Sequence, residues 1–175
     1  MRLSPGLGSL GDSYAVSFIL SKQRNGDLGA GWQRYQDYLQ SLRSRFPNSA
    51  FGLATSDWYF GFSDPRAPHD AHLKTISISE TPPDETDVFP IVTIRIRLFS
   101  ARGGIIEYFY PQVFRYQLAC SGYHSFHSDW RYDEFRLSDD DHVLHEIEWY
   151  HAGESGRWLI ESSDVQHQWY ANENA

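Results

Sequence analysis

The chain has 175 residues and a formal net charge of −8, with 41% hydrophobic and 16% aromatic residues. We expect a single domain over residues 1–175, because a chain of this length buries roughly two-thirds of the surface that it exposes when unfolded. The negative charge argues against nucleic-acid binding and favours cationic partners, and the aromatic residues follow the patterns of a packed core rather than of a disordered chain.

The sequence also carries information about compartment. Cys120 is the only cysteine, so the chain cannot form an internal disulfide. It shows no basic start followed by an apolar run and a small-residue cleavage site, and no apolar run approaches the roughly 20 residues of a membrane-spanning helix. We therefore expect a soluble cytoplasmic protein that does not contact a membrane.

Glycines near the N-terminus do not predict a cofactor site. Residues 1–12 should form an irregular lead-in, and they spell GxGxxG. The dinucleotide-binding fingerprint requires a strand before its glycines and a helix after them, whereas the glycines of residues 1–12 should be followed by a strand. Gly29 and Gly31 precede a helix but lack the Lys-Ser/Thr pair of a phosphate-binding loop. We therefore expect no cofactor.

The first regular elements should be a largely buried strand over residues 14–20 and one long helix near the N-terminus. The helix is indicated by apolar residues at helical spacing, and Pro47 should end it. Its apolar stripe consists of Trp32, Tyr35, Leu39, Leu42 and Phe46.

Alternating side chains then predict strands over residues 51–62, 73–79, 92–98, 105–110 and 113–119. Gly103 and Gly104 supply the positive φ angles of a hairpin turn. Pro111 interrupts the following run, so its second part is either a continuation past a bulge or a separate strand.

After residue 128 the chain alternates in four runs that can pair as consecutive hairpins. The register that keeps like side chains together places three rows on one face. The rows are Trp130, Trp149, Trp158 and Trp169; then Tyr132, Ile147, Ile160 and His167; and then Glu134, His145 and Ser162. A slip of one residue in the first hairpin would set Asp133 against Ile147 and is disfavoured.

The opposite face of these runs should carry Asp133, Glu146 and Glu161 side by side. Like charges that face each other destabilise a sheet by a few tenths of a kcal/mol or more. We therefore expect a basic partner, a bound cation or arginines of the chain to neutralise them, with Arg95 and Arg97 available on another strand.

Together these elements predict an α+β fold. It should be a mainly antiparallel, strongly curved sheet or open barrel of about eight to nine strands, packed on the one long helix near the N-terminus.

The acidic row favours a small, non-enzymatic binding protein. Asp133, Glu146 and Glu161, with Asp139, Asp140 and Asp141 beside them, would face a basic protein partner. Immunity proteins and antitoxins that meet basic toxins offer an analogy at the level of class alone.

Two alternatives remain open. The first is a small-molecule binding protein or enzyme with an aromatic pocket between helix and sheet, lined by Trp130, Trp149, Trp158, Trp169, Tyr132 and His167. Glu134, His145 and Ser162 offer a carboxylate, an imidazole and a hydroxyl there, although such a pair more often satisfies polar groups at a core edge. The second is a metalloprotein that uses His69, His72, His124, His127 and Asp129, whose spacing is also common among solvated loop histidines.

Overall fold

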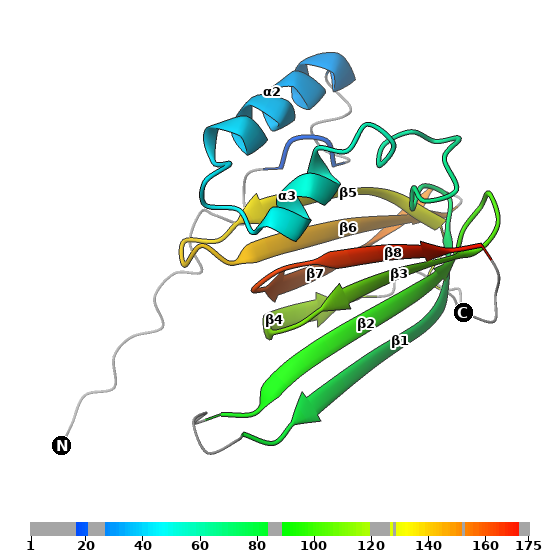
Figure 1. The fold of residues 1–175 in the computed structure, drawn as a ribbon. Coiled ribbons are helices and arrows are strands. Elements are labelled where there is room, and N and C mark those ends of the chain that lie inside the picture. Colours follow the sequence, from blue (N-terminus) through cyan, green and yellow to red (C-terminus); the bar gives the residue numbers. More distant parts are fainter. Residues whose placement is uncertain are drawn as a thin grey trace.

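The computed structural model describes residues 17–20, 27–83, 89–119, 127, 129–151 and 153–171. Within these residues, eight strands form an antiparallel sheet that does not close into a barrel, and two short helices lie over it (Figure 1). The fold is therefore mostly β, and the predicted lead-in over residues 1–12 lies outside the described residues. Neither helix has the length and apolar character needed to cross a membrane.

The helices are α2, Leu28–Ser41, and α3, Asn48–Ala54. The strands are β1, His72–Thr81; β2, Ile91–Phe99; β3, Ile105–Tyr110; β4, Val113–Leu118; β5, Asp129–Leu137; β6, Val143–His151; β7, Glu154–Ser162; and β8, Gln166–Tyr170. They lie in the order β4-β7-β6-β5-β1-β2-β3-β8.

The prediction of one long helix is only partly correct. α2 begins after Asp27, whose carboxylate accepts the Ala30 backbone N–H at 3.0 Å, and it buries Tyr35 and Leu39 against the sheet. The chain leaves the helix after Ser41, before the expected end at Pro47.

The strand predicted over residues 51–62 is wrong, because α3 and a series of turns occupy this region. A short apolar run fits a buried helix as well as a buried strand. Pro47 precedes α3 and gives it no side-chain cap. The Asp164 carboxylate supplies one from the far end of the chain, accepting the Ala50 N–H at 3.1 Å.

Two tyrosines of α2 accept hydrogen bonds from backbone N–H groups at the edge of β5. The Phe135 N–H donates to the Tyr35 hydroxyl at 2.7 Å, and the Leu137 N–H donates to the Tyr38 hydroxyl at 2.8 Å. β1 pairs with β5 only at one end of the strand, so these hydroxyls replace the neighbouring strand that β5 lacks.

The sheet bends at this junction, and its two four-stranded halves face each other. Among the described residues, His72 and Asp129 form the one residue pair between β1 and β5. The ring of Tyr108 on β3 stacks on Trp130 of β5, with centroids 5.1 Å apart. One cluster of buried side chains joins residues of both halves to residues of α2 and α3, and this cluster forms the core.

The strands before the bend follow the sequence prediction closely. β2 buries Ile94, Ile96 and Leu98 on one face, and Gly103 and Gly104 have φ angles of +96° and +87° in the turn to β3. β4 is a separate strand that pairs with β7. The strand predicted over residues 14–20 is different, because residues 17–20 form a bend and residues 14–16 lie outside the described residues.

The β5–β6 hairpin keeps the predicted pairing of Trp130 with Trp149 but changes register towards its turn. His145 faces Phe135 instead of Glu134, because the loop is one residue longer than predicted and a bulge after Trp130 compensates for it. A shift of one residue moves side chains to the other face, so the predicted faces of β5 are exchanged beyond the bulge.

The β6–β7 hairpin is tighter than predicted. His151 pairs with Glu154, so Trp158 faces Ile147 rather than Trp149. A shift of two residues leaves each side chain on its predicted face. The rings of Trp149 and Trp158 still touch, with centroids 4.9 Å apart.

The hairpin pattern predicts that β8 pairs with β7. In the structure β8 pairs instead with β3, at the other end of the sheet. Trp169 faces Ile106 and is therefore far from the other tryptophans in strand order. The connection is held by Asp164, which caps α3, and by the Ser163 N–H, which donates to the Gln112 carbonyl at 2.8 Å. These contacts hold the segment that connects β7, in one half of the sheet, to β8 in the other half.

Candidate functional site

The three residues predicted as a catalytic set do not meet. Glu134 faces Glu146 across the strands and therefore lies on the opposite face of the sheet from His145. The Ser162 hydroxyl donates to the Asp164 carbonyl at 2.9 Å. A carboxylate, an imidazole and a hydroxyl must lie within hydrogen-bond reach to act together, and this set does not satisfy that requirement.

His145 belongs instead to a buried polar network. Its Nε2 atom lies 2.9 Å from Oδ2 of Asp133, and its Nδ1 atom lies 2.7 Å from the Tyr110 hydroxyl. Asp133 also accepts hydrogen bonds from the Tyr59 hydroxyl at 2.6 Å and from the Trp130 indole N–H at 2.9 Å. All five side chains are buried. We call this set the buried network.

The tyrosines of the buried network are held in their protonated form. Burial, followed by the charge of Asp133, raises the pKa of Tyr59 and of Tyr110 well above the usual value for a phenol. The network joins β3, β5 and β6, and thus both halves of the sheet. Because its polar groups bond to one another and are closed to solvent, it stabilises the core rather than offering a reactive group to a substrate.

The opposite face of β5, β6 and β7 carries glutamates and arginines, and we call it the carboxylate face. Its glutamates are Glu134, Glu146, Glu148 and Glu161. Arg136 is buried and forms ion pairs with Glu134 and Glu146. Arg157 forms an ion pair with Glu146, and its Nη2 atom lies 3.6 Å from Oε2 of Glu148. Arginines of the chain therefore offset most of the negative charge.

The predicted acidic row is thus wrong for Asp133, which belongs to the buried network. Glu146 and Glu161 do share a face, but the arginines beside them come from the same half of the sheet. Arg115 of β4 lies 3.1 Å from Glu161.

Arg95 and Arg97, the predicted neutralising residues, both pair with Glu107 in the other half of the sheet. Arg97 faces Glu107 directly across the β2–β3 hairpin, and Arg95 lies diagonally opposite to it. The like charges of the carboxylate face are therefore balanced locally rather than by a distant strand.

Burial raises the pKa of Glu134 to about 7, against the opposing effects of Arg136 and of two backbone N–H donors. These donors are Ile19 at 3.0 Å and Phe18 at 2.9 Å. Glu134 thus ties the bend at residues 17–20 to β5, and its protonation state changes near neutral pH.

An aromatic pocket of about 350 Å³ lies between α2, the turns after α3, and β5. Its lining residues are Ile19, Leu28, Trp32, Asp57, Phe60, Phe62 and Tyr132. Trp32 and Phe60 meet edge to face with centroids 4.5 Å apart, and Phe62 meets Tyr132 in the same way at 6.2 Å. Asp57 is the charged residue among those that line the pocket.

Of the residues predicted to line a pocket, only Tyr132 lies at this one. Trp130, Trp149 and Trp158 are buried in the core. Trp169 and His167 of β8 make contacts elsewhere. The Trp169 indole N–H donates to the Gly103 carbonyl at 3.1 Å, and His167 Nε2 lies 3.0 Å from the Arg66 carbonyl oxygen.

The predicted histidine metal site does not form among the described residues. His72 pairs with Asp129 and His69 with Asp70, each at 3.1 Å. His127 packs against the Trp158 ring with centroids 4.9 Å apart. His124 lies outside the described residues. A different set, Asp140, His142 and Glu161, brings three metal-ligand atoms together.

Comparisons of this chain with protein-family models, with curated proteins and with solved structures gave no match.

Proposed function

We propose that the chain is a binding protein that holds an organic cation with an apolar body in the aromatic pocket. The observation that carries the proposal is the combination of four aromatic side chains with one exposed carboxylate, Asp57, around a single concave space. Aromatic ring faces attract cations, and such cages bind quaternary ammonium groups. The pocket volume falls in the range of small-molecule sites.

The charge of the pocket supports a cationic ligand over a neutral or anionic one. No hydrogen bond or ion pair links Asp57 to another described residue, so its charge is available to a ligand. The net charge of −8 should also raise the local concentration of cations and speed their association at low salt. The buried network supports binding rather than catalysis, because its polar groups bond to one another and its side chains are buried.

A pair of ligands of nearly equal shape tests this proposal. Phenyltrimethylammonium should bind at least about twofold more tightly than the neutral tert-butylbenzene, since a cation–π contact contributes about 0.5–2 kcal/mol. Asp57→Asn should weaken binding of the cation, and Trp32→Leu should weaken it further. Dissociation constants from NMR titration provide the measurement.

The matched control is Asp37→Asn, which removes an exposed carboxylate on α2 that does not line the pocket. Equal affinity for the two ligands, or equal weakening by the Asp57 and Asp37 variants, would contradict the proposal.

A second candidate function is the binding of a basic protein partner, as an immunity protein or antitoxin binds a toxin by class analogy. Glu146 and Glu161 are offset by arginines, whereas Asp139 and Asp140 at the tip of the β5–β6 hairpin are exposed. Asp141 beside them pairs with Arg45. This tip is therefore the acidic surface that supports a basic partner.

A lysine decapeptide serves as a probe for the acidic tip. The variant Asp139→Asn/Asp140→Asn should bind it more weakly at low salt, because exposed charges contribute mainly through long-range attraction that salt screens. Surface plasmon resonance at several salt concentrations measures the effect. Unchanged binding by the double variant would remove the tip as a partner surface.

A further inference from the structure

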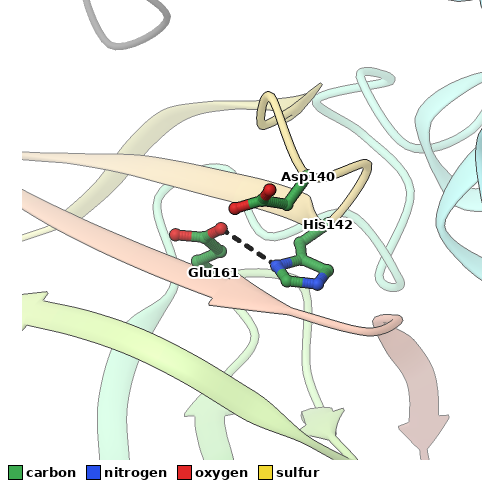
Figure 2. Close-up of side chains that lie close together, drawn as sticks. All are labelled: Asp140, His142 and Glu161. Carbon is green, nitrogen blue, oxygen red and sulfur yellow. Dashed lines mark hydrogen bonds and ion pairs between the residues drawn. The ribbon is translucent and has the colours of Figure 1, made fainter. Parts of the chain in front are cut away.

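A cluster of three metal-ligating side chains lies where the β5–β6 hairpin meets the end of β7. Asp140 and His142 come from the hairpin loop and Glu161 comes from β7 (Figure 2). One ligand atom from each residue lies within 4.8 Å of the other two. This set shares no histidine with the metal site predicted from the sequence. We propose that these three residues bind a divalent transition-metal ion, with Zn²⁺ as the best fit.

Two of the three ligands are already held in place. Nδ1 of His142 lies 3.1 Å from Oε1 of Glu161. Arg115 lies 3.1 Å from the other carboxylate oxygen, so it orients Glu161 with Oε1 towards the histidine. The His142 ring stacks on Phe114 with centroids 3.6 Å apart and planes 10° apart. Both side chains are therefore constrained before any ion arrives, which lowers the entropy cost of binding.

The loop backbone supports the same arrangement. The His142 N–H donates to the Ser138 hydroxyl at 3.1 Å, and the Ser138 N–H donates to the His142 carbonyl at 2.8 Å. Asp141 has a φ of 62°, a left-handed conformation that turns the chain between the two loop ligands. Asp140 is exposed, so its side chain can move without disturbing packed atoms.

The distances fit a small ion. Zinc bonds to nitrogen and oxygen are about 2.0–2.2 Å long, which places neighbouring ligand atoms of a tetrahedral site about 3.3–3.5 Å apart. The separation of 3.1 Å between His142 and Glu161 is close to this value. All separations in the cluster lie within 4.8 Å, so Asp140 would have to move by at most about 1.5 Å.

The ligand types select the kind of ion. An imidazole with two carboxylates favours Zn²⁺, Mn²⁺ or Co²⁺, whereas Ca²⁺ and Mg²⁺ prefer oxygen ligands alone. Two carboxylates also balance the charge of a divalent ion. The ion would replace the contact between His142 and Glu161, while Arg115 would keep its contact with the second oxygen of Glu161. Three protein ligands leave a fourth position of a tetrahedral site for water or substrate.

Calorimetric titration of metal-free protein with ZnCl₂ tests the proposal. We expect one saturable site per chain, and we expect Asp140→Asn and His142→Phe each to weaken it by at least about tenfold. The phenylalanine variant keeps a flat ring against Phe114 but removes the ligand atom. Asp139→Asn is the matched control, since it removes a neighbouring exposed carboxylate outside the cluster, and it should leave the affinity within about twofold.

Cobalt gives an independent measurement, because Co²⁺ bound in a tetrahedral site absorbs visible light strongly. The wild-type chain should develop these bands, and the Asp140 and His142 variants should not. Absence of saturable binding would overturn the proposal and leave an ion-pair cluster of His142, Glu161 and Arg115. Equal weakening by the Asp139 and Asp140 variants would show unspecific attraction to the acidic loop and would overturn it as well.

Discussion

Replacing Asp133 with alanine should lower the free energy of unfolding by about 3–5 kcal/mol, the cost of breaking a buried charged network. The carboxylate accepts from the Tyr59 hydroxyl and the Trp130 indole N–H and contacts His145 Nε2. All these groups are buried, so none can turn to water when the acceptor is lost. Urea denaturation followed by tryptophan fluorescence measures the change.

Asp133→Asn separates the loss of charge from the loss of shape. It keeps one oxygen as an acceptor but aims a donor at groups that also donate, so a loss of about 2–4 kcal/mol is expected. The exposed Asp139→Asn variant should change stability by less than about 0.5 kcal/mol. If Asp133→Ala were no more costly than this control, the carboxylate would not organise the core.

The second large effect is expected at the carboxylate face. Glu146→Gln should destabilise the fold by about 2–4 kcal/mol, because Arg136 is buried and loses the full charge of one partner. The pattern of like charges in the sequence points to the opposite sign, since removing one of several adjacent carboxylates should relieve repulsion. Thermal or urea unfolding therefore distinguishes a neutralised face from a repulsive one.

An exposed ion pair on the same hairpin provides the comparison. Asp141 pairs with Arg45, and their side chains are 52% and 47% exposed. Asp141→Asn should cost less than about 1 kcal/mol, because water and salt screen an exposed pair. A gain in stability on Glu146→Gln would mean that the glutamates repel one another after all.

The sequence predicts the strands far better than it predicts their partners. Alternation of Ile94, Ile96 and Leu98 gives the buried face of β2, and Gly103 and Gly104 give the turn after it. These are local properties of the chain. The pairing of β8 with β3 depends on a distant contact, in which Asp164 caps α3, and no pattern along β8 encodes that contact.

A single bulge explains why two of the predicted site residues, Asp133 and Glu134, lie on the faces opposite to those predicted. The pattern favours Glu134 opposite His145, because this register keeps Trp130 opposite Trp149 without an irregularity. The structure keeps the tryptophan pair but places a bulge after Trp130, which turns Asp133 towards His145. The disfavoured register becomes favourable because Asp133 finds donors from other elements, including the Tyr59 hydroxyl.

The sequence patterns do not predict either candidate site, because each site joins residues from separate elements. The aromatic pocket takes Trp32 from α2 and Phe60 from a turn that resembles a strand in its alternation. The metal cluster joins His142 to Glu161 across two strands, and their spacing in the sequence matches no known ligand motif. The acidic run beside His142 was the one local signal for this second site.

The location of a bound cation tests the proposed function most directly. Nuclear Overhauser effects should connect the methyl protons of bound phenyltrimethylammonium to ring protons of Trp32, Phe60 and Tyr132, which line the aromatic pocket. Contacts with none of these rings, or contacts confined to the acidic tip at Asp139 and Asp140, would contradict a cation site in this pocket.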